Sequence, residues 1–164
     1  MSEISLKPMT RLLAHRFYKE FIPDPDLFQD KTQWKPFDYS ERFVDARIAR
    51  YKALGRVYMA VMLDGKPIGE IVLKQIDYSK KCCTMGISMI NDSYKNQGYG
   101  TVAEKLILQY AFDQMGLQTV YADSLTTNLR SQHVLQKVGF AEIGRDAQFV
   151  YYRCDKPQIE AEAL

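Results

Sequence analysis

The sequence is poor in cysteine, in net charge and in long apolar runs. Its cysteines, Cys82, Cys83 and Cys154, form an odd set with two adjacent members, which gives neither a disulfide framework nor the ligand spacing of a zinc site. The net charge of +2 comes from 22 basic and 20 acidic residues that are interspersed, so we expect no patch for nucleic acid or for a membrane surface. The first eight residues contain no apolar core of the kind found in signal peptides, and the sequence contains no run of about 18 apolar residues. We therefore expect a cytoplasmic protein that holds no metal ion.

What the sequence does contain is enough apolar material for one core. Of its 164 residues, 46% are hydrophobic and 12% are aromatic, which is sufficient to fill the interior of one compact domain. We expect that domain to span residues 1–156 and to be followed by a loose C-terminal tail at 157–164.

Hydrophobic periodicity and turn signals predict the element order β-α-α-β-β-β-α-β-α-β-β, a mixed sheet of the α+β class. Asp64-Gly65 predicts a hairpin between two of the strands, and the proline-rich residues 22–38 predict a long irregular loop. The expected strands are 4–6, 56–63, 68–76, 82–90, 119–125, 140–144 and 148–154, and the expected helices are 10–20, 40–54, 101–115 and 128–138.

The segment with the clearest chemistry is Lys95-x-x-Gly98-x-Gly100, which stands between a strand and a long amphipathic helix. Glycines let the backbone turn tightly and point N–H groups outward, and the helix N-terminus adds unpaired donors and a partial positive charge. Such an arrangement suits a pyrophosphate. Alternatively, the two glycines only shape the turn, since their spacing fits neither a dinucleotide fingerprint nor a Walker A loop.

This segment resembles the signature of the GNAT family of acetyl-coenzyme A-dependent N-acetyltransferases, Arg/Gln-x-x-Gly-x-Gly/Ala, with Lys95 where Arg or Gln is usual. A second block, from Asn128 to Phe140, is also similar to the family and looks most like its ribosomal-protein-alanine acetyltransferase branch. The resemblance extends over residues 4–154. It implies the GNAT-like fold, a central, mostly antiparallel sheet of about seven strands with about four helices.

The resemblance also implies where a coenzyme would bind. Backbone N–H groups of residues 96–101 would hold the pyrophosphate, and the strand edge at Met89 and Ile90 would pair with the amides of the pantetheine arm. Lys95 would keep a positive charge near the phosphates, or is alternatively a solvated loop lysine. Asn128 is also the expected N-cap of its helix. The predicted coenzyme-binding residues are Met89, Ile90, Lys95, Asn96, Gln97, Gly98, Tyr99, Gly100, Thr101, Asn128 and Ser131.

Two side chains are predicted to be catalytic. Many family members carry a tyrosine, the acid for the departing thiolate, where this sequence has Leu135. By resemblance to the branch, Ser131 is the substitute acid, because it lies on the apolar side of its helix; a purely structural serine is the alternative. Glu70 is the first choice for the base that deprotonates the amine, unless it forms a surface ion pair with Lys74. Asp123 is the second choice for the base.

The resemblance implies acetyl-CoA as cosubstrate and transfer to a primary amine, on a protein N-terminus, a polyamine or a small molecule. The acidic residues of loop 22–38 would border the acceptor, or this is an ordinary solvated loop anchored by Trp34 and Phe37. An alternative function of another class is a coenzyme-binding or interaction module on the same fold without transfer activity. Leu135 and Lys95, which depart from the residues usual in the family, leave this alternative open. A homodimer is expected from the family resemblance alone.

Overall fold

The computed structural model describes residues 3–28 and 30–158, in which seven strands and four α-helices follow the predicted order. The predicted tail beyond residue 158 lies outside the described residues. The strands are β1 (Ile4–Pro8), β2 (Val57–Leu63), β3 (Lys66–Asp77), β4 (Cys82–Met89), β5 (Thr119–Leu125), β6 (Ala141–Arg145) and β7 (Phe149–Asp155). The α-helices are α1 (Arg11–Glu20), α2 (Glu41–Ala53), α3 (Tyr99–Gln109) and α4 (Leu129–Val138).

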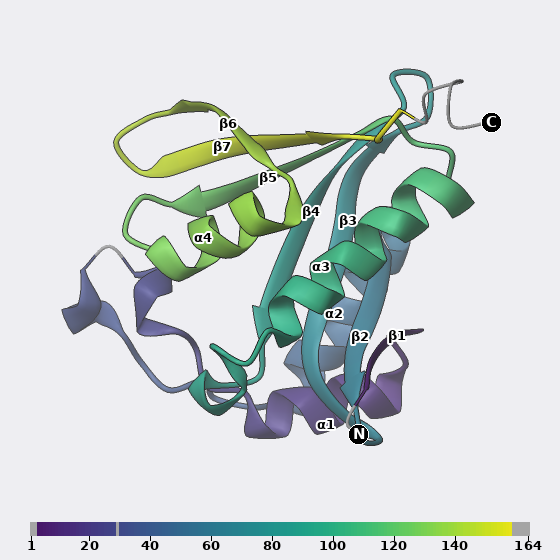
Figure 1. Ribbon diagram of the computed structural model, residues 1–164. Coiled ribbons are helices and arrows are strands. Elements are labelled where there is room, and N and C mark those ends of the chain that lie inside the picture. The colour runs from purple at the N-terminus through teal and green to yellow at the C-terminus, as the bar shows by residue number, and fades with distance from the viewer. Residues whose placement is uncertain (1–2, 29, 159–164) are drawn as a thin grey trace.

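The strands form one sheet in the order β1-β2-β3-β4-β5-β7-β6. Every neighbouring pair is antiparallel except β4 and β5, which confirms the prediction of a mostly antiparallel sheet. These two parallel strands pair only where Cys82 to Thr84 meet Thr119 to Tyr121, and they then diverge (Figure 1). The divergence splits the sheet near its centre.

Helices cover both faces of the sheet, with α3 in front of the strands and α2 behind them in Figure 1. Helix α1 packs on α2, and α4 packs on α3. Their apolar sides meet the sheet in one core, whose fully buried members include Phe17 of α1, Ile71 of β3 and Ile107 of α3. Among the described residues, no helix combines the length and the apolarity needed to cross a membrane.

The irregular loop predicted at residues 22–38 is anchored by its aromatic side chains. Trp34 Nε1 donates a hydrogen bond of 2.8 Å to the carbonyl oxygen of Pro23. The Phe37 ring packs against Tyr18 of α1, with ring centroids 5.2 Å apart. The two aromatic anchors expected for this loop are therefore confirmed, whereas its expected contact with an acceptor stays a prediction.

Candidate active site

Two adjoining cavities lie where β4 and β5 diverge. The first, which we call the helix cavity, has a volume of about 250 Å³ and is bordered by the start of α3 and by α4. The second, the split cavity, has a volume of about 380 Å³ and passes between the diverged parts of β4 and β5. Residues that line both are Leu27, Ile87, Glu104, Asn128 and Ser131. A ligand that enters at α3 can therefore extend into the split of the sheet.

The start of α3 offers a row of unpaired backbone donors. Asn96 and Gly98 have φ of 60° and 80°, a left-handed conformation that turns the chain sharply into the helix. The first hydrogen bond into the helix runs from Val102 N to Gly98 O at 3.1 Å. In the described part of the chain, the N–H groups of residues 96–101 have no acceptor, and no side chain caps the helix. These donors and the helix dipole together suit an anion.

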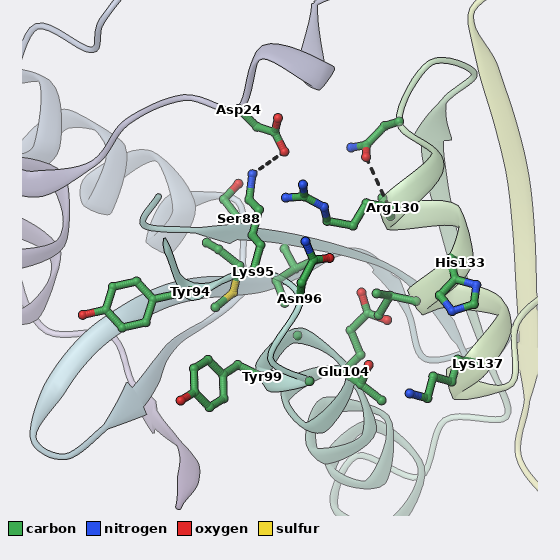
Figure 2. A pocket seen from close by; sticks show the side chains of 18 of the residues that line it. Asp24, Ser88, Tyr94, Lys95, Asn96, Tyr99, Glu104, Arg130, His133 and Lys137 are labelled. Atoms are coloured by element: carbon green, nitrogen blue, oxygen red, sulfur yellow. Dashed lines mark hydrogen bonds and ion pairs between the residues drawn. The ribbon is translucent and has the colours of Figure 1, made fainter. Parts of the chain in front are cut away.

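Gly100 and Arg130 fit a phosphate-bearing ligand such as acetyl-CoA. A Cβ added to Gly100 would meet no atom within 4 Å, although the residue lines the helix cavity, so the glycine keeps the space in front of the donors open. Arg130, in the first turn of α4, extends toward Lys95 and Asp24 (Figure 2). Its buried Nη1 atom makes no hydrogen bond within the described chain and lies 3.7 Å from Asp92 Oδ1, beyond hydrogen-bond distance, so it can still donate to a phosphate oxygen.

Lys95 lies in the wall of the helix cavity, but its charge is already paired. Its ammonium donates to Asp24 and lies 2.9 Å from Asp92 Oδ1, and only 11% of its side chain is exposed. Burial acts to raise the pKa of Asp24, but hydrogen bonds from Lys95 and from the backbone of Asp26 outweigh it and lower that pKa. Lys95 is therefore not a free phosphate partner here, and the alternative of a solvated loop lysine is wrong.

The edge of β4 is only partly as predicted. Ile90 is fully buried, its N–H donates to Ile68 O at 2.7 Å and its carbonyl accepts from Ile22 N at 2.8 Å. Since backbone groups alternate in direction along a strand, Ile87 and Met89 point theirs away from β3 and toward the split. The structure thus places Met89 at the helix cavity and does not bring Ile90 there.

The residues predicted to hold the pyrophosphate, 96–101, which we call the cradle, lie around the entrance of the helix cavity. Asn96, Gly98, Tyr99, Gly100 and Thr101 line the helix cavity. The side chain of Gln97 does not, since it is exposed and donates to Ser93 O at 2.6 Å. For Gln97 only the backbone N–H can serve the predicted role.

Asn128 and Ser131 lie together at the junction of the two cavities. Asn128 Oδ1 accepts from Ser131 N at 3.2 Å, which confirms the expected N-cap of α4. The half-buried Ser131 side chain faces the cavities, and its hydroxyl has no hydrogen-bond partner in the described chain. Leu135, where many family members have tyrosine, is buried and lines the split cavity.

Glu70 is buried on the other face of the sheet. Only 3% exposed, it accepts hydrogen bonds from Tyr18 at 2.6 Å, from Tyr58 at 2.5 Å and from Arg47 at 2.7 Å. Burial, and then the charge of Glu70, raise the pKa values of both tyrosines. The alternative of a surface ion pair with Lys74 is wrong, because Glu70 faces inward and pairs with Arg47.

The two candidate bases differ in their access to the site. Glu70 is absent from the linings of both cavities. Asp123 is exposed and lines the split cavity. The structure therefore brings Ser131, but not Glu70, to the two cavities.

Some polar residues that line the helix cavity were given no role in the sequence analysis. They include Tyr94, Glu104, Arg130, His133 and Lys137 (Figure 2). For Glu104 a signal existed. It precedes Ile107 by three residues and Ala111 by seven, which places a carboxyl on the apolar side of α3. A charged residue at such a position needs either a partner or a ligand.

Comparisons with known proteins agree with this geometry. A sequence model of the Acetyltransferase (GNAT) domain matches residues 3–141. The "Uncharacterized N-acetyltransferase YnaD" of Bacillus subtilis (strain 168) is 34% identical over 56 residues, which are 34% of this chain and only 33% of that protein. The "Putative ribosomal N-acetyltransferase YdaF" of the same organism is 26% identical over 134 residues, 76% of this chain and 73% of that protein.

The fold is shared with solved structures over nearly the whole chain. AAC(6')-Ib, solved in complex with ribostamycin and coenzyme A, matches with a TM-score of 0.75 at 17% identity and over 94% of both chains. This likeness shows the fold. With the family match to residues 3–141, it follows that the chain belongs to the GNAT acetyltransferase family, whose members use acetyl-CoA.

Proposed function

We propose that this protein transfers the acetyl group of acetyl-CoA to a primary amine in a ternary complex. The observation that carries the proposal is the row of unpaired N–H groups at residues 96–101, which opens onto a cavity that continues into the split between β4 and β5. The phosphates of a coenzyme suit the first part of this path, and its extended arm suits the second.

The residues of the chain would bind the cosubstrate and handle protons. Acetyl-CoA supplies the acetyl group as a thioester. The N–H groups of 96–101 and Arg130 hold phosphates, and the free backbone of Ile87 and Met89 orients the arm toward the split. There a C–N bond forms to the attacking amine as the C–S bond breaks. The Ser131 hydroxyl donates to the departing sulfur, which leaves tolerably because a thiol has a pKa of about 8.5.

The base that takes the proton of the amine is a separate part of the proposal. Glu70 remains the predicted base, although three donors already occupy its carboxylate. We expect Glu70→Gln to flatten the acidic limb of the pH profile of kcat/KM if the role is correct. An unchanged limb in a folded variant would remove Glu70 and leave Asp123, which lines the split cavity, as the candidate.

The acceptor class follows from the family, and relatives suggest amines of different size. YdaF is named for a ribosomal acceptor, and AAC(6')-Ib was solved with ribostamycin, an amine-bearing small molecule. The split cavity carries Lys74 and Asp123, charges of both signs, so it does not select a strongly cationic acceptor. We therefore propose a primary amine without a finer substrate, in a protein that forms a homodimer as is common in the family.

Gly100→Glu tests the coenzyme site. The new side chain would put bulk and negative charge in front of the cradle, and we expect the Kd for acetyl-CoA to rise by roughly 30-fold or more by calorimetry. The helix should still form, because an acidic residue in its first turn is favourable. Gly144→Glu, on the exposed strand β6 and also with open space at its Cβ, is the matched control. Equal affinities of the two variants would refute the cradle.

A coenzyme-binding module without transfer activity is the second candidate function. It is favoured by Leu135 in place of the usual tyrosine and by the paired state of Lys95. Release of free thiol from acetyl-CoA in the presence of a broad amine panel separates the two. Turnover with any amine supports the enzyme, and tight coenzyme binding with no turnover supports the module.

A further inference from the structure

Glu104 is a buried carboxyl without a partner at the centre of the site. It lies in α3, one helical turn after Gly100, and is 2% exposed. Figure 2 shows its side chain leaving α3 and ending in the space beside α4. Its Oε2 atom is buried without a hydrogen bond, and no hydrogen bond or ion pair involves its carboxyl in the described part of the chain.

Such a group is costly to the free protein, because a buried polar atom without a partner loses its hydrogen bonds to water. Burial raises the pKa of Glu104 to about 8, so near neutral pH the carboxyl is mostly protonated and offers one O–H donor and one acceptor oxygen. The other charged or titratable residues that line the same cavities are Asp24, Lys74, Tyr94, Lys95, Tyr99, Asp123, Arg130, His133 and Lys137. None of them forms an ion pair with Glu104 in the described chain.

The position of Glu104 defines what it would meet. Residues four apart lie on one side of a helix, so Glu104 continues the side on which Gly100 keeps the entrance open, about 6 Å further along the axis. It lines both cavities, as does Ile87, whose free backbone groups lie on β4. A chain running from the cradle into the split therefore passes between Glu104 and β4.

We propose that the Glu104 carboxyl is a hydrogen-bond partner for an amide of the pantetheine arm of the coenzyme. This inference rests on the proposed function. The arm is the part of coenzyme A that follows the pyrophosphate, and it carries two amides with carbonyl oxygens that accept the O–H of a protonated carboxyl. Coenzyme binding then satisfies the buried group that the free protein leaves unpaired.

The test compares two ligands and two variants by calorimetry at pH 7. Coenzyme A contains the arm, whereas adenosine 3′-phosphate 5′-diphosphate has the nucleotide and all three phosphates without it. We expect Glu104→Met to raise the Kd for coenzyme A by roughly 5- to 10-fold and to leave the Kd for the nucleotide within about 2-fold. Glu104→Gln keeps a donor and an acceptor and should retain most of the affinity. Gln109→Met, exposed on the same helix, is the control.

The outcomes separate this inference from the function on which it rests. If Glu104→Met binds coenzyme A as tightly as the unaltered protein does, or loses affinity for both ligands by the same factor, the proposed amide contact is wrong and the proposed function stands. If the unaltered protein binds neither ligand, both proposals fail. Folding does not obscure the result, because both Glu104 variants remove a buried acid and should have a thermal midpoint at or above that of the unaltered protein.

Discussion

Among the described residues, two glutamates are buried on opposite faces of the sheet, and they differ in their hydrogen bonds. Glu70 is surrounded on the α1 and α2 side by Tyr18, Arg47 and Tyr58, all within hydrogen-bond distance. Glu104, on the α3 side, is about as deeply buried, yet its carboxyl has no partner in the described chain. The Glu70 carboxyl is hydrogen-bonded within the protein, whereas the Glu104 carboxyl is free to bind a ligand.

The difference between the two glutamates distinguishes a buried group that holds the fold together, which we call framework, from a buried group that belongs to the site. A buried charge with several donors fixes the elements that carry them, here β2 and β3 against α1 and α2, and removing one partner exposes the charge of the other. A buried carboxyl without a partner stabilises nothing in the free protein, and we assign the one at Glu104 to the proposed ligand. Loss of a partner of Glu70 should therefore lower the stability of the fold, whereas loss of the Glu104 carboxyl should raise the stability and weaken ligand binding.

The largest expected effect is on the framework side. Arg47→Met leaves Glu70 with two neutral donors and no positive charge, and we expect it to lower the free energy of unfolding by about 3–5 kcal/mol, measured by urea denaturation. Arg11→Met removes the exposed ion pair with Asp45 and should change the stability little. Similar losses from the two variants would show that the Glu70 cluster is not a framework.

The second prediction concerns the pH dependence of stability at Glu104. Its pKa is raised by burial from about 4.5 to about 8, so folding binds a proton and the unaltered protein loses stability as the pH rises between these values. Glu104→Gln removes this loss. Its stability advantage should grow from pH 5 to pH 8 by roughly 2–4 kcal/mol and level off above about pH 9.

The matched measurement is the same pair of proteins unfolded in urea across this pH range. Because the two proteins share every other titratable group, the difference between their stabilities isolates the buried carboxyl. A difference that does not change with pH would mean that Glu104 is ionised in the folded protein, or that it has a partner, and the contrast with Glu70 would then be lost.

The sequence predicted the frame of the fold because local signals agreed with it. Asp64 and Gly65 both adopt positive φ in the expected hairpin, and the order of strands and helices follows the hydrophobic periodicity. The sharp turn at residues 96–101 could also be predicted from the sequence, since the spacing of glycines reflects the backbone conformation directly.

The parts that sequence could not supply depend on contacts between distant segments. Lys95 is paired with Asp24, 71 residues earlier, through a loop whose path has no periodic signal. The burial of Glu70 arises because α1, α2 and β2 each bring one donor to the same point on β3, and no spacing along the chain predicts that convergence. The carbonyl oxygen of Ile90, which was predicted to pair with the coenzyme, instead accepts a hydrogen bond from Ile22 N of the same irregular loop.

The smallest expected effect lies at Asn128, which belongs to both sides of the comparison. It is 7% exposed, lines both cavities, and caps α4 by accepting from Ser131 N. Asn128→Ala should cost about 1 kcal/mol in unfolding experiments, and Asn128→Ser, which can cap a helix, should recover most of that loss. If both variants unfold alike but bind coenzyme A differently, Asn128 serves the ligand rather than the helix. A paired polar residue would then behave like Glu104, and pairing within the chain would no longer distinguish framework from site.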